Sequence, residues 1–181
     1  SNPLKLKSIY PDSKRLAETM CMSWSHEYNV KTIVIRLFHT YGPFINIKDG
    51  RIFSMIIDNL INKKIFTLNN LTNKRCFCYA TDFLNAFLLI LSQSKENFMI
   101  YNLANIYQEF SIKEFINEIK KEFNEFNIKT KILNNKGLNK FIIKRARPDI
   151  SNLVKLGWKP EINVRQGFRK TYNYYISLKK N

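Results

Sequence analysis

The residues best placed to do chemistry are Tyr10 and Lys14, which lie in the segment Tyr10-Pro11-Asp12-Ser13-Lys14. Residues i and i+4 share one face of a helix, so the phenol and the ammonium group can converge on one spot. A neighbouring ammonium group favours the phenolate form of tyrosine, which is the form that a general base needs. The spacing is common in a chain rich in both residue types, so a solvated helix start is the alternative interpretation.

The elements around this pair predict half of a parallel α/β unit. From Ser13 to about Tyr28, apolar residues recur at helical spacing with charged residues among them. The run Thr32–Phe38 is short, apolar and rich in β-branched residues, which is typical of a strand buried on both faces. Tyr41-Gly42-Pro43 marks the end of that strand.

The rest of the chain also mixes helices and strands. Asp82 is expected to cap a helix, and Ser111 with Glu114 forms a capping box for the next one. The remaining predicted elements are helices at Ile52–Ile61, Ile112–Phe123, Ser151–Leu156 and Val164–Leu178, and strands at Ile65–Leu68, Arg75–Ala80, Met99–Leu103 and Lys129–Leu133.

One part of a doubly wound fold is not found in this sequence. Such a sheet needs several parallel strands, whereas this chain supplies one or two before its pattern changes. Its five glycines form no G-x-G-x-x-G or G-x-x-G-x-x-G loop. The strand at Thr32–Phe38 is therefore expected to be the end of a sheet whose beginning is missing.

Composition narrows the class of protein. The 181 residues are 45% hydrophobic and 14% aromatic, which is typical of a folded domain. The net charge of +16 favours anionic partners: nucleic acid, an anionic membrane or phosphorylated small molecules. Because the basic residues are dispersed and no known nucleic-acid-binding pattern is present, a nucleic-acid-binding module is the weaker interpretation.

The cysteines and the lengths of the apolar runs allow predictions of the cellular compartment and of membrane association. Cys21, Cys76 and Cys78 are odd in number and unevenly spaced, so we expect no disulfide framework and a reducing, cytoplasmic compartment. Cys76 and Cys78 are interpreted as buried strand thiols, and no metal site is predicted. The longest uninterrupted apolar run, Phe87–Leu91, is far shorter than a bilayer requires, so no membrane partner is predicted.

Further motifs follow Tyr10 and Lys14 in order along nearly the whole chain. They are Lys14-Arg15-Leu16-Ala17-Glu18, Arg36-Leu37-Phe38-His39-Thr40-Tyr41-Gly42-Pro43, Arg75-Cys76-Phe77-Cys78-Tyr79-Ala80-Thr81-Asp82, Tyr101-Asn102-Leu103-Ala104-Asn105, Arg147-Pro148-Asp149 and Leu156-Gly157-Trp158-Lys159-Pro160. This series resembles the extended short-chain dehydrogenase/reductases of the NAD-dependent nucleotide-sugar epimerase/dehydratase family. The segments Lys14–Cys21 and Asp49-Gly50-Arg51 resemble the UDP-glucuronate decarboxylases within it.

The resemblance implies roles for particular residues. Tyr10 would deprotonate the sugar 4-hydroxyl while hydride passes to NAD, and Lys14 would hold the nicotinamide ribose. Arg75 and Arg147 match the family arginines that grip the nucleotide diphosphate, and Arg51 would lie near the same nucleotide. His39 stands where family members usually carry Asn in contact with the substrate.

The resemblance also implies a fold and a domain organisation. Residues 1–45 would be the last helix and strand of a Rossmann-type doubly wound sheet, and residues 46–181 a small mixed α/β nucleotide-sugar-binding domain. The family's N-terminal half, with its Gly-rich NAD loop, is absent, so the chain as given is expected to be inactive, and to form a homodimer or a self-associating fragment. The parent enzyme would act on a nucleotide sugar, with a UDP-sugar favoured, through a 4-keto intermediate. A non-catalytic remnant that binds a nucleotide sugar is the alternative.

Overall fold

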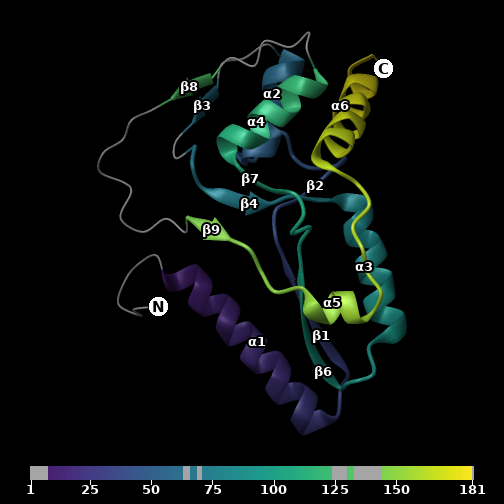
Figure 1. Ribbon diagram of the computed structural model, residues 1–181. Coiled ribbons are helices and arrows are strands. Elements are labelled where there is room, and N and C mark those ends of the chain that lie inside the picture. The colour runs from purple at the N-terminus through teal and green to yellow at the C-terminus, as the bar shows by residue number, and fades with distance from the viewer. Residues whose placement is uncertain (1–7, 63–65, 69–70, 124–129, 133–143, 181) are drawn as a thin grey trace.

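The computed structural model describes residues 8–62, 66–68, 71–123, 130–132 and 144–180. The helices are α1 (Ile9–Tyr28), α2 (Ile52–Asn62), α3 (Ala80–Gln93), α4 (Ile112–Glu122), α5 (Ser151–Lys155) and α6 (Val164–Lys180). The strands are β1 (Thr32–Leu37), β2 (Thr40–Tyr41), β3 (Phe66–Leu68), β4 (Lys74–Cys76), β5 (Cys78–Tyr79), β6 (Phe98–Leu103), β7 (Glu109–Ser111), β8 (Thr130–Ile132) and β9 (Arg145–Ala146). In Figure 1, α1, β1, β6, α3 and α5 make up one part of the molecule, and α2, α4 and α6 lie together in the other.

Helix α1 carries Tyr10 and Lys14 and begins earlier than its predicted start at Ser13. Pro11 fits in the first turn because the backbone N–H groups there have no partner inside the helix. Asn29 ends the helix in the left-handed conformation, with a φ of 52°. The chain then turns directly into β1, as the sequence predicts.

β1 and β6 form a parallel ladder that lies between two helices (Figure 1). Ile35 of β1 packs in the same apolar cluster as Ile90 of α3, whereas Arg36 pairs with Glu18 of α1. Successive strand residues face opposite sides, so α1 and α3 cover opposite faces of the ladder. This layering is that of a Rossmann-type α/β domain. The domain boundary near residue 45 stays a prediction, and β6 extends the same sheet beyond it.

The two edges of this ladder differ. On the outer edge of β6, Asn152 donates to the carbonyl of Ile100 (3.3 Å), and Asn102 donates to the carbonyl of Asp149 (2.8 Å). β1 pairs with β6 alone among the described strands. Its residues are half-buried or exposed, so the predicted burial of this strand on both faces is wrong for this chain, because the sheet ends at β1 here.

The short strands that the structure describes form three small sheets. β2 pairs with β5, β3 pairs with β8, and β4 is the centre of the sheet β7-β4-β9. The predicted single strand Arg75–Ala80 is divided, because β4 and β5 belong to different sheets and Ala80 already begins α3. Phe77 lies at the break and stacks on Phe115, with 4.1 Å between ring centroids. β3 and β8 confirm two predicted strands, whose ends at Ile65, Lys129 and Leu133 lie outside the described residues.

The larger apolar cluster lies between α2, α4 and α6 (Figure 1) and includes Phe53, Phe115 and Phe168. Helix α4 begins with the predicted capping box, because the Ser111 hydroxyl accepts from the Glu114 N–H (3.1 Å) and the Glu114 carboxylate accepts from the Ser111 N–H (2.7 Å). The predicted helices at α2, α4, α5 and α6 are all present. These helices therefore follow from local pattern alone.

Asp82 is not the predicted helix cap. Tyr79 occupies the N-cap of α3, and Asp82 lies inside the first turn with 1% exposure. Its carboxylate accepts from the N–H groups of Glu161 (3.0 Å) and Ile162 (3.1 Å). Trp158, which is buried as predicted, donates its indole N–H to the Asp82 carbonyl (3.0 Å). Asp82 therefore ties α3 to the segment that leads into α6.

Cys76 and Cys78 are fully buried, which confirms their interpretation as strand thiols. Burial raises the pKa of Cys76 to about 11 and that of Cys78 to about 12. Both are therefore protonated near neutral pH. In the ranges that the structure describes, no helix is both long enough and apolar enough to span a membrane.

Candidate active site

Tyr10 and Lys14 lie together near the start of α1, as their spacing predicts. The Lys14 ammonium nitrogen is 5.7 Å from the centroid of the Tyr10 ring, and Tyr10 is 70% exposed. Both residues line a hollow of about 440 Å³, the α1–β1 hollow, whose other wall is Val34–Leu37. This places the pair beside the carboxyl end of β1, which is where parallel α/β sheets bind their ligands.

An ion pair that the sequence analysis did not single out lies in the same hollow. Arg36 of β1 binds both oxygens of Glu18 of α1, at 2.7 and 2.5 Å. The hydrogen bond from Arg36 lowers the pKa of Glu18 below its usual value, so Glu18 is a carboxylate at neutral pH. The two residues lie on different elements, and no sequence spacing reveals such a pair. It holds α1 against β1 and so helps to place Tyr10 and Lys14.

His39 follows β1 and adopts a left-handed conformation, with a φ of 41°. Its ring centroid is 5.9 Å from that of Phe77. Although the residue still reaches solvent, the protein atoms that bury its ring lower its pKa to about 4, and the positive charges of Arg75 and Arg51 contribute. His39 is therefore neutral at pH 7 and can offer a hydrogen bond without carrying charge.

Arg51 and Arg75 are the two cations whose fields reach His39. Arg51 precedes α2, is largely exposed, and pairs with Asp49 at 3.4 Å. Arg75 lies half-buried in β4 and donates to the carbonyl of Lys74 (2.7 Å), and burial lowers its pKa. The structure thus brings three predicted binding residues into one region. Two guanidinium groups whose charges act on a neutral imidazole suit an anionic ligand.

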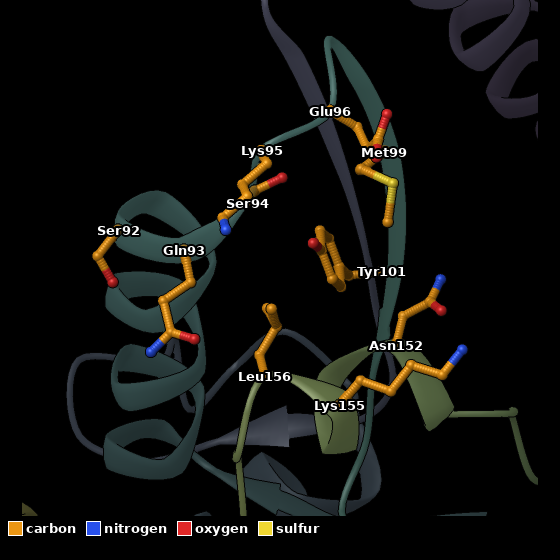
Figure 2. Close-up of a pocket in the computed structure, with 10 residues that line it drawn as sticks. All are labelled: Ser92, Gln93, Ser94, Lys95, Glu96, Met99, Tyr101, Asn152, Lys155 and Leu156. Carbon is orange, nitrogen blue, oxygen red and sulfur yellow. The ribbon is translucent and has the colours of Figure 1, made fainter.

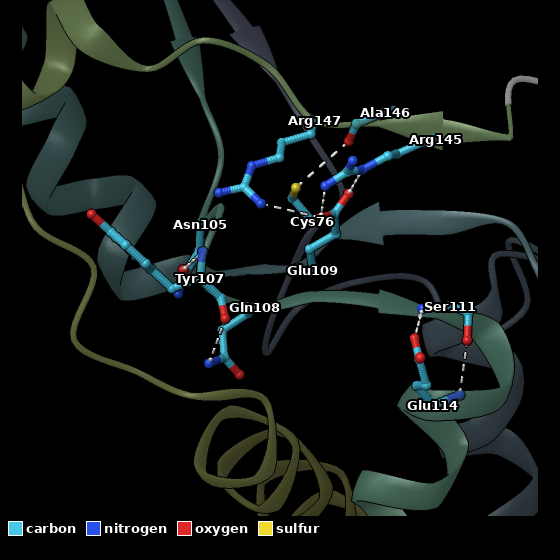
Figure 3. A network of polar contacts seen from close by, with 10 residues as sticks. All are labelled: Cys76, Asn105, Tyr107, Gln108, Glu109, Ser111, Glu114, Arg145, Ala146 and Arg147. Atoms are coloured by element: carbon cyan, nitrogen blue, oxygen red, sulfur yellow. Dashed lines mark hydrogen bonds and ion pairs between the residues drawn. The ribbon is translucent and has the colours of Figure 1, made fainter.

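Arg147 belongs to a different group, which Figure 3 shows. Arg145 binds both carboxylate oxygens of Glu109 at 2.7 Å, and Arg147 binds one of them at 3.4 Å. Ala146 is the register partner of Arg75, so Arg145 projects from the face of the sheet opposite Arg75. The structure therefore groups Arg147 with Glu109 and Arg145, and not with Arg75.

Glu109 and Thr40 lie next to the predicted site residues Arg147 and His39 and were not singled out from the sequence. The Glu109 side chain is 9% exposed, and the hydrogen bond from Arg145 lowers its pKa. The Thr40 hydroxyl, next to His39, is buried and has no hydrogen-bond partner among the described residues. Arg145 and Arg147 are two residues apart, so in a strand they face the same side and could share an acidic partner. Which acidic residue this is follows only from the pairing of β7 with β4 and of β4 with β9, which brings Glu109 to them.

The chain belongs to the NAD dependent epimerase/dehydratase family, whose sequence profile matches residues 1–104. UDP-glucuronic acid decarboxylase 3 from Arabidopsis thaliana is 31% identical over 168 residues, which are 92% of this chain and 47% of that protein. UDP-glucuronic acid decarboxylase 1 from Xenopus tropicalis is 29% identical over 182 residues, which are 96% of this chain and 40% of that protein. The chain thus spans less than half the length of these relatives.

Solved structures share the fold. UDP-N-acetylglucosamine 4-epimerase from Methanobrevibacter ruminantium, in complex with UDP-N-acetylmuramic acid, matches with a TM-score of 0.80 and 22% identity over 98% of this chain and 59% of that one. dTDP-glucose 4,6-dehydratase from Bacillus anthracis, in complex with NAD, matches with a TM-score of 0.78 and 20% identity over 99% of this chain and 56% of that one. These matches confirm the predicted Rossmann-type α/β class.

Proposed function

We propose that this chain carries the catalytic pair and the nucleotide-sugar-binding part of an enzyme that transiently oxidises C4 of a UDP-sugar, with UDP-glucuronate favoured. The observation that carries the proposal is the position of Tyr10 and Lys14 in a hollow beside the carboxyl end of β1. The names of the decarboxylase relatives support the choice of sugar. The nucleotide sugar would lie between this hollow and the region of His39, Arg51 and Arg75.

The residues present fit only one end of the NAD cofactor. Tyr10 and Lys14 suit the nicotinamide ribose, whereas the sequence contains no Gly-rich loop for the diphosphate. When bound, NAD would accept hydride from C4 of the sugar and later return it. Tyr10 would take the proton of the sugar 4-hydroxyl, and Lys14 would stabilise the phenolate and hydrogen-bond the ribose. The resulting 4-keto sugar can be decarboxylated, dehydrated or epimerised.

The cationic residues would bind the nucleotide. Arg75 and Arg51 would meet the diphosphate, because guanidinium groups match phosphate oxygens in charge and geometry. Arg147 would have to leave its ion pair with Glu109 to reach the same anion, because that pair lies on the face of the sheet opposite Arg75. The neutral His39 would give the sugar a hydrogen bond in the position where the family has Asn.

The open edge of β1 is where the missing NAD-binding half would pair, whether on the same polypeptide or on another. Without it we expect no turnover and no NAD binding. We also propose that this chain self-associates and that the parent enzyme is a homodimer. We further propose a cytoplasmic location, which the three free thiols support.

Calorimetric titration with UDP tests the binding half of the proposal. We expect Arg75→Ala to weaken UDP binding about tenfold, because it removes a charge-assisted contact to phosphate. Lys170→Ala, an exposed cation on α6, is the matched control and should bind UDP normally. Equal affinity in both variants would contradict a diphosphate site at Arg75.

Turnover tests the catalytic half. With NAD and UDP-glucuronate, the 181-residue chain alone should give no sugar-nucleotide product by chromatography. Adding the part of the Arabidopsis decarboxylase that this chain does not match should restore product, and Tyr10→Phe should abolish it. Product from the chain alone would contradict the proposal. UDP binding without turnover in the complemented protein would favour a non-catalytic nucleotide-sugar binder.

A further inference from the structure

A second pocket, called here the α5 pocket, lies between the end of α3, the start of β6 and α5 (Figure 2). Its volume of about 590 Å³ lies within the range of small-molecule sites. Met99 and Tyr101, the second and fourth residues of β6, line it together with Leu156. The α1–β1 hollow instead adjoins the carboxyl half of β1. The two cavities share no lining residue: α1 lines one of them, whereas the end of α3 and α5 line the other.

The α5 pocket contains two hydroxyl groups without partners. Tyr101 is 2% exposed, and in Figure 2 its ring projects from β6 into the space in front of α3. Its hydroxyl makes no hydrogen bond with any described residue. Ser94 is 5% exposed, and its hydroxyl also has no partner in the described part of the chain. Buried hydroxyls are normally hydrogen-bonded, so the buried, unpaired hydroxyl of Ser94, beside a Tyr101 hydroxyl that keeps accessible surface, points to a ligand.

The charges at the rim favour an anion. Lys95 is next to Ser94, and neither Lys95 nor Glu96 forms an ion pair with a described residue. In Figure 2, Glu96 is at the Met99 end of the opening, and Lys155 extends away from α3. Lys95 is therefore a cation of the pocket rim that is free to pair with an anion beside Ser94. The carboxyl end of α3 carries partial negative charge, which weakens the binding of any anion here and of a dianion most.

The walls of the α5 pocket are fixed by hydrogen bonds from other elements. The Lys31 ammonium group donates to the carbonyl of Ser94. The carbonyl of Asn97 accepts from the Ser25 hydroxyl (2.9 Å) and from the Thr32 N–H (2.7 Å). The bond from Asn152 to β6 holds α5 in place. A pocket held in this way needs little rearrangement to bind.

We propose that the α5 pocket is a second binding site for a small organic monoanion, a carboxylate on a flat apolar body. The body would pack against Met99, Leu156 and the Tyr101 ring. The carboxylate would pair with Lys95 and accept from the hydroxyls of Tyr101 and Ser94. This site does not depend on the proposed catalytic function, since none of its residues lies in the α1–β1 hollow.

Nuclear magnetic resonance titration tests the site, with benzoate as the probe and benzamide as its neutral counterpart. Benzoate should shift the amide signals of residues 94–101 with a millimolar dissociation constant, and benzamide should bind at least about fivefold more weakly. Tyr101→Phe and Lys95→Ala should each weaken benzoate about fivefold. Lys170→Ala should leave its affinity unchanged. Phenyl phosphate, a dianion, should bind more weakly than benzoate.

Ser94→Ala separates a ligand contact from a simple packing defect. We expect it to raise the melting temperature of the free protein, because a buried unpaired hydroxyl is removed, and also to weaken benzoate binding. A raised melting temperature with unchanged affinity would contradict the role of Ser94. No shift at residues 94–101, or equal binding of benzoate and benzamide, would overturn the proposed site.

Discussion

At the scale of single residues, His39 combines two unusual properties. Its φ of 41° lies in a region that residues other than Gly rarely enter, although Asn, Asp and His do so more often than the rest, and its pKa is lowered to about 4. The folded protein therefore keeps His39 neutral between about pH 4 and the ordinary value near 6.5, whereas the unfolded chain takes up a proton there. The contribution of His39 to the free energy of unfolding is therefore fully present above about pH 6.5 and is lost as the pH falls toward 4.

His39→Asn should remove this pH dependence. Asn tolerates the left-handed conformation, so we expect a change of less than about 0.5 kcal/mol in the free energy of unfolding at pH 7. Between pH 7 and pH 4.5 the variant should lose less stability than the wild type, as measured by urea unfolding. His26→Asn, on the exposed surface of α1, is the control. The same loss in His39→Asn and in the wild type would show that His39 does not titrate as described.

The spacing of Tyr10 and Lys14 shows how far sequence reasoning reaches at this scale. Two residues one turn apart on a helix must share a face, so their proximity could be predicted. Glu109 and Arg145 are far apart in sequence, and their contact depends on strands that pair only in the folded protein. For the same reason, the sequence could not show that Arg147 is grouped with Glu109 and not with Arg75.

At the scale of elements, Asp82 fixes α3 to the segment before α6. Asp82→Asn keeps the shape but replaces one acceptor oxygen by a donor, so one of the N–H groups of Glu161 and Ile162 loses its partner. We expect a loss of about 2–3 kcal/mol in the free energy of unfolding by urea. Glu96→Gln, an exposed carboxylate, should change it by less than about 0.5 kcal/mol. Equal stability of the two variants would contradict this role.

Helix α6 packs closely on β2 and β5 at Gly167. A Cβ atom there would lie 2.5 Å from the Tyr41 hydroxyl oxygen and 2.7 Å from a ring carbon of Tyr79. In an exposed helix, Gly→Ala is stabilising by about 1 kcal/mol. Here the overlap should win, and Gly167→Ala should lower stability by about 1–3 kcal/mol in thermal unfolding. Asn173→Ala, on the exposed side of α6, should raise it slightly; a rise in both variants would contradict the close packing.

The elements that could be predicted are those fixed by local pattern. Helix α4 follows from Ser111 and Glu114, and β6 from its apolar run. The break at Phe77 and the role of Asp82 could not be predicted, because each depends on a partner distant in sequence. The expected burial of β1 was wrong for a different reason: its composition suits the middle of a sheet, and in the described part of the chain it stands at an edge.

At the scale of the whole molecule, α1 exposes a row of apolar side chains, and contiguous apolar patches of this kind mark contact surfaces. Leu16, Met20 and Trp24, spaced by four residues on α1, are 61%, 52% and 60% exposed. We expect association that grows with concentration in sedimentation velocity. Met20→Lys should reduce it, whereas Thr19→Lys adds the same charge one residue earlier and should reduce it less. Equal sedimentation of both variants and the wild type would show that this row is not the contact.

The free edge of β1 allows a prediction for single residues, because the backbone N–H groups of β1 point alternately to β6 and to the free edge. The N–H of Thr32 donates to Asn97 (2.7 Å) and that of Phe38 donates to Leu103 (3.1 Å), so with the parallel register between them the N–H groups of Val34 and Arg36 also face β6. The N–H groups of the odd-numbered residues 33, 35 and 37 face the free edge.

The exchange rates of single backbone amides in β1 therefore show which N–H groups lack a hydrogen-bond partner. In dilute protein, where association is minimal, the amides of residues 33, 35 and 37 should exchange at least about tenfold faster than those of residues 34 and 36. Adding the part of a decarboxylase relative that this chain does not match should slow the odd-numbered amides alone, because a parallel strand would now accept them. Slowing by concentration of this chain alone would instead identify a second copy as the strand donor. Uniform protection in the dilute monomer would mean that β1 is not the margin of an incomplete sheet, and the proposal that this chain needs a separate NAD-binding half would fail with it.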